Sequence, residues 1–153
     1  MVRRKDGTLL AYLREEAFDL GDDRQLTHRI LLSQSFDNGE SWSLAVPTAL
    51  PNPNSSLEVL ALRDGRWVMV YNDSEEDRHT LALAMSDDEG RSWTGFRRLE
   101  DQPGGQFHYP SIIQTRDGRI QVTYTFQPGA KIGRSIKHVS LDPDWIKAAS
   151  AGR

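Results

Sequence analysis

The sequence contains no cysteine. Disulfide bonds, zinc sites built from thiolates and a cysteine nucleophile are therefore excluded. No apolar run reaches the roughly 20 residues of a membrane-spanning helix, so we expect no membrane partner. The charge balance lacks a basic excess, because 19 Lys and Arg face 22 Asp and Glu for a net charge of −3. This balance excludes the electrostatic footprint of a nucleic-acid-binding domain.

Metal and phosphate motifs are missing as well. The four histidines show no ligand spacing, and no glycine-rich loop follows a strand and opens a helix. We therefore expect no metal and no cofactor. The basic segment at residues 1–6 is followed by an apolar run of only Leu9 to Leu13, which is too short for a secretion signal. The localisation stays open, with the cytoplasm expected if the chain is complete.

One eight-residue pattern, Ser-x-Asp-x-Gly-x-x-Trp, occurs twice with a period of 51 residues (86 − 35). It predicts a tight loop between antiparallel strands, in which Ser and Asp bond backbone N–H groups, Gly takes a positive φ, and Trp folds under the loop. Chance recurrence of an octapeptide at fixed spacing is improbable in a chain of this length. The pattern is carried by Ser35, Asp37, Gly39 and Trp42, and again by Ser86, Asp88, Gly90 and Trp93.

Three Asp-Gly pairs indicate three hairpins, because Asp-Gly between apolar runs is a strong hairpin signal. They stand at residues 6–7, 64–65 and 117–118, each before an alternating run. The later two follow clear first strands at 57–62 and 110–115. The first has only residues 1–5 before its turn, so its leading strand is short or absent.

A third strand is expected after each hairpin, at residues 26–33, 80–85 and 132–139, and a fourth near 46–49 and 96–99. In the third unit, residues 140–145 keep Ser, Asp and Trp but lack Gly, and Asp144 is expected to cap a short helix reaching Ala149. A four-stranded antiparallel unit of about 50 residues is typical of a β-propeller blade. An immunoglobulin-like sandwich also has short strands but would not repeat its turns at a fixed period.

We therefore predict an all-β chain forming one domain of about three propeller blades, at 1–50, 51–101 and 102–150, with a short C-terminal helix. Three blades do not close a ring, since propellers use about four to eight. Either the chain is part of a longer one, or identical chains complete the ring. We favour a homodimer giving six blades.

The blade topology places the Asp-Gly turns and the repeated Trp loops at one end of the sheets. The opposite end receives the other connections, which are rich in polar residues, so we expect any functional site there. These connections are residues 14–25, 51–56, 72–79, 101–109 and 127–134.

Two residues at that end are candidates for chemistry. Tyr109 opens an innermost strand, where it is a hydroxyl donor, a nucleophile if a carboxylate takes its proton, or a packed aromatic residue. Arg14 ends a second strand, where its guanidinium either grips a carboxylate ligand or pairs with a neighbouring Glu.

Five further residues are candidates for substrate binding. Asn54 and Ser55 bind sugar hydroxyls or hold their own turn, and Asn72 takes the place in its blade that Arg14 has in the first. Arg78 either binds a ligand or is a solvated loop charge. His108 either acts as a base or is a structural imidazole. Glu58 is expected to pair with Arg63 or to face solvent. The binding candidates are Asn54, Ser55, Asn72, Arg78 and His108.

The chain resembles the sialidase-like proteins with bacterial neuraminidase repeats, in which the repeated octapeptide is called the Asp-box. Beyond the two Asp-boxes, residues 51–55 (Pro-Asn-Pro-Asn-Ser) and 109–114 (Tyr-Pro-Ser-Ile-Ile-Gln) match the C-terminal part of predicted neuraminidases. Residues 6–14 and 136–139 extend the likeness across nearly the whole chain. The resemblance implies half of a six-bladed propeller.

The resemblance also implies a site. Sialidases bind a sialic acid carboxylate with three arginines and use a tyrosine nucleophile with a nearby Glu and an Asp acid/base; a tyrosine nucleophile is an exception among glycosidases. Tyr109 matches the nucleophile, Arg14 matches one arginine, and Arg78 is a looser match for another. The remaining arginine and the Asp belong to blades that this sequence lacks, and the Glu would precede residue 1.

Three functional hypotheses follow. The first is a sialidase-like exo-glycosidase acting on a terminal acidic sugar once the ring is complete. The second is a non-catalytic module that binds glycan or assembles with itself. The third is a lyase acting on uronate-containing polysaccharide. The expected partners are a carbohydrate ligand and a second copy of the chain.

Overall fold

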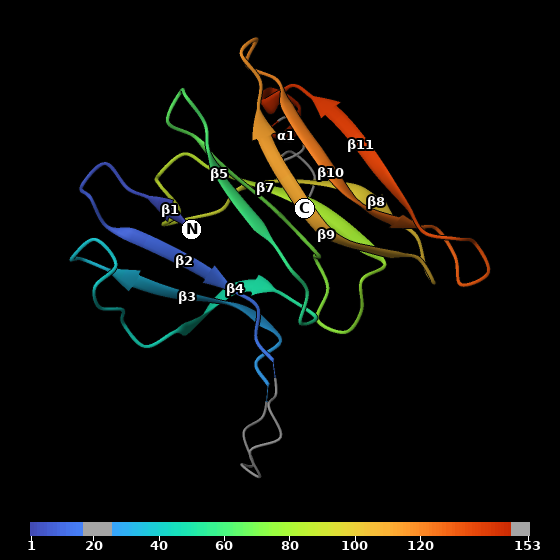
Figure 1. The fold of residues 1–153 in the computed structure, drawn as a ribbon, viewed down its shortest axis with the longest axis horizontal. Helices are drawn as coiled ribbons and strands as arrows, with labels where there is room; N and C mark the ends of the chain where they lie inside the picture. The colour runs from blue at the N-terminus through green and yellow to red at the C-terminus, as the bar shows by residue number, and fades with distance from the viewer. Residues whose placement is uncertain (17–25, 148–153) are drawn as a thin grey trace.

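The computed structural model describes residues 1–16 and 26–147, which form three antiparallel sheets arranged next to one another in an arc (Figure 1). The first sheet contains β1 (Val2–Arg3), β2 (Leu9–Leu13), β3 (Arg29–Ser35) and β4 (Val46–Pro51). The second contains β5 (Glu58–Ala61), β6 (Trp67–Tyr71), β7 (Thr80–Ser86) and β8 (Gly95–Asp101). The third contains β9 (Gln106–Gln114), β10 (Ile120–Gln127) and β11 (Ser135–Leu141), and α1 (Pro143–Lys147) follows it.

The sheets have the strand order of propeller blades, and we call them blades 1, 2 and 3. Within each sheet every strand pairs with the next one in the chain, and the first strand β5 contacts both β1 and β9 across the blades. The all-β fold and the short helix predicted from the sequence are confirmed, as is the short leading strand β1, which has two residues. The blades form an open arc and do not close into a ring (Figure 1).

Blade 3 ends differently from the other two, as the sequence predicted. Among the described residues it has three strands, because after β11 the chain turns into α1. The predicted cap Asp144 lies inside this helix, and Asp142 accepts the Asp144 N–H at 2.9 Å instead. The expected end of the helix at residue 149 lies outside the described residues. No helix in the described part of the chain has the length and apolar character to cross a membrane.

Two apolar clusters hold the blades together. Between blades 1 and 2, Leu10 and Ile30 pack against Trp67, Met69 and Ala84. Between blades 2 and 3, the other face of blade 2 packs against β9, β10 and Ile146 of α1. Blade 2 is therefore covered on both faces, which explains why all residues of β6 and β7 are buried. Burial of apolar surface at about 25 cal/mol per Å² makes these interfaces the main stabilising contribution.

The Asp-box loops have the predicted geometry. In the first, Ser35 Oγ accepts the Gly39 N–H at 2.8 Å and donates to Asp37, whose carboxylate accepts the Ser41 N–H at 2.9 Å. Gly39 has a φ of +96°, which only glycine adopts without strain. The second loop repeats these bonds from Ser86, Asp88, Gly90 and Ser92.

The two Asp-box tryptophans differ in their surroundings. Trp93 packs edge-on against Tyr12 of blade 1, with ring centroids 5.9 Å apart. Trp42 is 39% exposed, so the tryptophan that was expected to pack under its loop is only partly buried in blade 1. The loop of blade 2 is also tied to blade 1, because Lys5 N donates to Glu89 and Arg4 Nε donates to the Glu89 carbonyl. These contacts confirm that Asp-Gly turns and Asp-box loops lie at the same end.

Removing the two Asp-box carboxylates is expected to have unequal effects. We expect Asp88→Ala to lower the free energy of unfolding by about 2 kcal/mol, because bonds from Ser92 and Ser86 are lost in a loop braced between two blades. Asp37→Ala is the matched variant, with the same bonds in an exposed loop that, among the described residues, does not contact a second blade through a residue such as Glu89, and is expected to cost less. Urea denaturation measures both, and equal losses would contradict the bracing argument.

The same carboxylate has a pH signature. Burial raises the pKa of Asp88, but hydrogen bonds from Ser92 and Ser86 outweigh it and lower the pKa to about 2. The folded-state pKa is therefore below the ordinary value of 3.8. The stabilising contribution of the Asp88 carboxylate is present above about pH 4 and is lost as the pH falls toward 2. The free energies of unfolding of the wild-type protein and of Asp88→Ala are therefore expected to converge in acid.

Candidate functional site

Tyr109 occupies an unusual position at the end opposite the Asp-boxes. It lies within β9, yet its φ is +53°, in the left-handed region that bulky residues avoid. The pairing of β9 with β10 is interrupted here by a bulge between Thr123 and Thr125. The bulge exposes 59% of the side chain on an innermost strand. Such strain costs on the order of 1–3 kcal/mol and is concentrated at functional sites.

His108 lies against Tyr109, with ring centroids 4.7 Å apart and the rings nearly perpendicular. The side chain is 6% exposed, and its Nδ1 atom has no hydrogen-bond partner. Burial lowers the pKa of His108, and the charges of Arg78 and Arg134 lower it further. The imidazole is therefore neutral at pH 7, with a ring nitrogen available to a ligand or a water molecule.

Asn72 connects three segments beneath Tyr109. It is fully buried, and its Nδ2 donates to the Thr80 carbonyl and, at 2.7 Å, to the Phe107 carbonyl. The amide therefore joins the end of β6 and the start of β7 to β9, two residues before Tyr109. The sequence suggested substrate binding for Asn72, whereas the structure gives its NH₂ group a positioning role. Its Oδ1 atom has no partner.

Arg78 links this cluster to Asn54. Its Nη2 donates to the Asn54 carbonyl at 2.8 Å, and its own carbonyl accepts the Phe107 N–H at 2.9 Å. Arg78 is therefore half-buried and bonded, and the alternative of a solvated loop charge is wrong. Asn54 also has a left-handed backbone, with a φ of +55°.

The cluster contains several buried polar atoms without hydrogen-bond partners. Buried polar groups are nearly always bonded, so unpartnered ones call for an explanation such as a water molecule or a ligand. Ser55 belongs to this set with Asn54, and the bonds through Arg78 join their loop to His108. The atoms are Asn54 Oδ1, Ser55 Oγ, Ser56 Oγ, Asn72 Oδ1, Thr80 Oγ1 and His108 Nδ1.

Two residues of this region were not selected from the sequence. Arg134 follows β10 on an exposed loop, where its Nε donates to Gln127 at 3.0 Å and its charge acts on His108. Ser56 is a half-buried hydroxyl next to Ser55. A composition rich in Ser, Asn and Arg at the blade end was the available signal for both.

Arg14 lies apart from this cluster. It forms an ion pair with Glu16 at 3.6 Å and is 42% exposed, which matches the surface-pair interpretation. Within residues 1–16 and 26–147, no hydrogen bond joins it to Tyr109 or to Arg78. Blade 1 carries Arg14 and blade 3 carries Tyr109, at the two ends of the arc.

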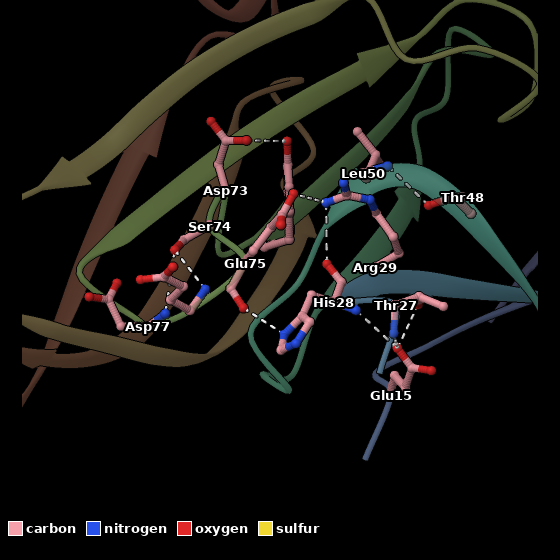
Figure 2. Close-up of polar contacts among 12 residues, drawn as sticks. Glu15, Thr27, His28, Arg29, Thr48, Leu50, Asp73, Ser74, Glu75 and Asp77 are labelled. Carbon is pink, nitrogen blue, oxygen red and sulfur yellow. Dashed lines mark hydrogen bonds and ion pairs between the residues drawn. The ribbon is translucent and has the colours of Figure 1, made fainter. Parts of the chain in front are cut away.

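A separate polar network bridges blades 1 and 2 at this end (Figure 2). Glu15 accepts the Thr27 N–H at 2.6 Å and the His28 N–H at 3.1 Å. His28 Nδ1 lies 2.9 Å from the Glu75 carbonyl oxygen, and the Glu75 carboxylate pairs with Arg29. This network fixes the two blades relative to each other. In the described part of the chain, no group of His, Asp and Glu side chains forms a metal site.

Glu58 is placed differently from the prediction. Its Oε2 accepts the Ile112 N–H of β9 at 2.9 Å, whereas Arg63 bonds the carbonyls of Thr115 and Arg116. The carboxylate therefore ties the innermost strands of blades 2 and 3 together. Its partner lies three residues beyond Tyr109 in the chain.

Comparison with known proteins places the sequence in context. The family model described as BNR repeat-like domain matches residues 1–122. A search of curated proteins finds no match.

Solved structures with similar folds include three glycosidase-related proteins. A leech intramolecular trans-sialidase, complexed with 2,7-anhydro-Neu5Ac, superposes with a TM-score of 0.74 at 18% identity over 95% of this chain and 23% of that one. A Penicillium chrysogenum α-L-arabinanase complexed with arabinobiose gives 0.65 at 15% identity, covering 92% and 44%. A Fusarium graminearum GH93 α-L-arabinofuranosidase gives 0.62 at 16%, covering 91% and 43%. The chain thus spans less than half the length of each.

Proposed function

Because the chain belongs to the BNR repeat-like domain family, we propose that it is a carbohydrate-directed propeller segment that hydrolyses a terminal acidic sugar once its ring is complete. The main support is the strained, exposed Tyr109 in contact with His108, whose Nδ1 has no partner, on a strand whose Phe107 bonds Asn72 and Arg78. Further buried polar atoms without partners lie on Asn72 and on the loop of Asn54 and Ser55. A sugar hydroxyl both donates and accepts hydrogen bonds, so a sugar can satisfy amide, hydroxyl and imidazole groups together.

Charge supports the acidic sugar. Arg78 and Arg134 both act on His108, and neither has an ion pair with a carboxylate among the described residues. A guanidinium binds a carboxylate through two parallel hydrogen bonds. A sugar acid at this end would therefore meet two positive charges, while its hydroxyl groups reach the loop of Asn54 and Ser55.

The proposed reaction assigns Tyr109 as the nucleophile. Its Oη forms a bond to the anomeric carbon while the bond from that carbon to the leaving oxygen breaks, and water later displaces the tyrosine. A carboxylate must take the tyrosine proton, and an acid must protonate the leaving oxygen. Among the described residues no carboxylate is hydrogen-bonded to Tyr109, so we assign both groups to the remainder of the ring.

Hydrolysis of a fluorogenic sialoside by the purified chain tests this function. Release of the fluorophore supports the hydrolase, and a parallel assay with a fluorogenic arabinofuranoside tests the substrate of one structural neighbour. Retained binding of sialyllactose without turnover selects the non-catalytic glycan-binding module instead. A rise in ultraviolet absorbance from an unsaturated uronate product selects the lyase.

We also propose that a second copy of the chain completes the ring. The outward faces of the two terminal blades expose apolar side chains, with Ile136 at 72% and Ile113 at 57% on blade 3 and Leu13 at 42% on blade 1. Exposed apolar surface of this kind marks interaction sites. A twofold arrangement would bring blade 1 of one copy, with its Arg14, next to blade 3 of the other, with its Tyr109.

Light scattering is expected to give a solution mass near twice 17.3 kDa. Ile136→Glu should convert this species to the monomer, because the charge would be buried at the interface. Ile132→Glu is the matched control, since Ile132 is 55% exposed but lies on the loop after β10. A stable wild-type monomer would rule out completion by a second copy.

A further inference from the structure

A groove of about 590 Å³ opens between blades 1 and 2 on their outer side, away from Tyr109. The outermost strand β4 forms one wall, and the loop Gly90–Trp93 and Phe96 of blade 2 form the other. Its volume falls within the roughly 300–1,000 Å³ of small-molecule sites. None of its lining residues belongs to the Tyr109 cluster.

The sequence of β4 explains why the groove exists. Its two prolines, Pro47 and Pro51, lack the N–H group that a strand donates. Pairing with β3 is limited to three residue pairs with a break in register, whereas β8 pairs with β7 at six positions. The outer edge of blade 1 is consequently not packed onto blade 2. The same prolines make the edge of β4 a poor template for an added peptide strand.

Partly exposed aromatic rings line the groove and are rigidly held. Tyr12, Trp93 and Phe96 are half-buried, and Tyr12 lies edge-on to Trp93. Tyr12 also reaches the backbone of Gly90, where a Cβ would lie only 2.4 Å from its hydroxyl oxygen. Glycine is therefore required at position 90, and the aromatic wall is preorganised across the two blades.

The polar groups of the groove carry balanced charge. Asp73 lines the groove and pairs with Arg98 at 3.2 Å, and Arg91 lies 3.9 Å from Asp6. Asp73 and Arg98 also line a second hollow of about 470 Å³ that continues past Phe96. Within the groove itself a charged ligand would find no uncompensated partner, whereas the hollow past Phe96 also contains Arg97, whose Nε donates to the Trp145 carbonyl. A neutral ligand with hydroxyl groups finds donors and acceptors beside the rings.

We propose that this groove is a second carbohydrate site, which binds neutral oligosaccharides by stacking sugar rings on Trp93 and Phe96 and bonding their hydroxyls to Asp73 and Arg98. The site does not depend on turnover at Tyr109. It gives the chain a means to hold a polysaccharide while the other end acts on a terminal residue.

Indole N–H signals of the four tryptophans in an NMR spectrum test the proposal. Xylo-, gluco- and arabino-oligosaccharides at millimolar concentration are the probes. We expect at least one to shift the Trp93 signal, while the signal of Trp42, in the matching loop of blade 1, stays in place. Tyr109→Phe should retain the shift, which separates this site from the proposed hydrolase.

Two substitutions on the same outer segment locate the binding. Val46 lines the groove and is 52% exposed, so Val46→Phe is expected to fill it and abolish the shift without disturbing the core. Leu44, 89% exposed and outside the lining, provides the control Leu44→Phe, which should keep the shift. Failure of all three probes, or a shift that survives Val46→Phe, would overturn the proposal.

Discussion

Asn72→Asp is expected to lower the free energy of unfolding by about 3–5 kcal/mol, the largest stability change anticipated for a single atom replacement in this chain. The amide donates two hydrogen bonds to backbone carbonyls in a fully buried position. A carboxylate at the same place would present negative charge to both carbonyl oxygens. Guanidinium denaturation at pH 7 measures the loss.

The loss should shrink in acid. Burial beside two acceptors raises the folded-state pKa of the introduced carboxyl above the ordinary Asp value of about 3.9. The penalty is therefore smallest below pH 4, where the carboxyl is protonated in both states and donates one bond, and it grows as the pH rises toward the raised pKa.

The control is Asn38→Asp, an exposed position whose Oδ1 already accepts from Arg3 at 2.8 Å. We expect its stability to change by less than about 0.5 kcal/mol. A similarly small effect for Asn72→Asp would show that the bridge between β6, β7 and β9 does not hold the site.

Tyr109→Phe is expected to reduce turnover of the substrate found in the hydrolysis assay on the order of 10³-fold or more, with little change in stability. The substitution removes a single oxygen from a side chain that is 59% exposed, so the fold loses no bond to it. Steady-state kinetics and thermal unfolding measure the two effects.

Tyr124→Phe provides the matched control for the same atom replacement. The Tyr124 hydroxyl donates to Glu100 of β8 at 2.5 Å, between blades 3 and 2. Its loss should reduce stability by about 1 kcal/mol and leave kcat unchanged. Unaltered kcat in Tyr109→Phe would refute the role of nucleophile and leave the strained backbone to serve binding alone.

The blades and their loops were accessible from the sequence because their signals are local. Each Asp-box is closed by hydrogen bonds between residues two to four apart, so an eight-residue pattern contains all the bonding partners. The hairpins follow from Asp-Gly pairs in the same way. The different ending of blade 3 was also predicted from a local signal, because residues 140–145 lack the Asp-box Gly and the chain turns at Asp142 and Pro143 into a helix after β11.

The contacts among the candidate site residues were not predictable from the sequence. That Arg78 and Asn72 bond Phe107, the neighbour of His108, depends on how blade 2 packs on blade 3, and these contacts join residues far apart in the chain. The bulge that exposes Tyr109 lies at Tyr109 and Pro110, where the proline is a sequence signal, but its register is set by pairing with β10. The groove beside Trp93 needs the relative placement of β4 and β8.

The sequence alone determined the repeated unit, its strand order, the Asp-box chemistry and the end of the blades where polar residues gather. All of these depend on hydrogen bonds and turn preferences within a few residues, which a single stretch of sequence contains. Only the tertiary structure decided that Asn72 supports Tyr109, that Glu58 ties β5 to β9, and that buried polar atoms stay without partners. Those features arise where separate blades meet, and the fit between their surfaces is set by the whole arrangement.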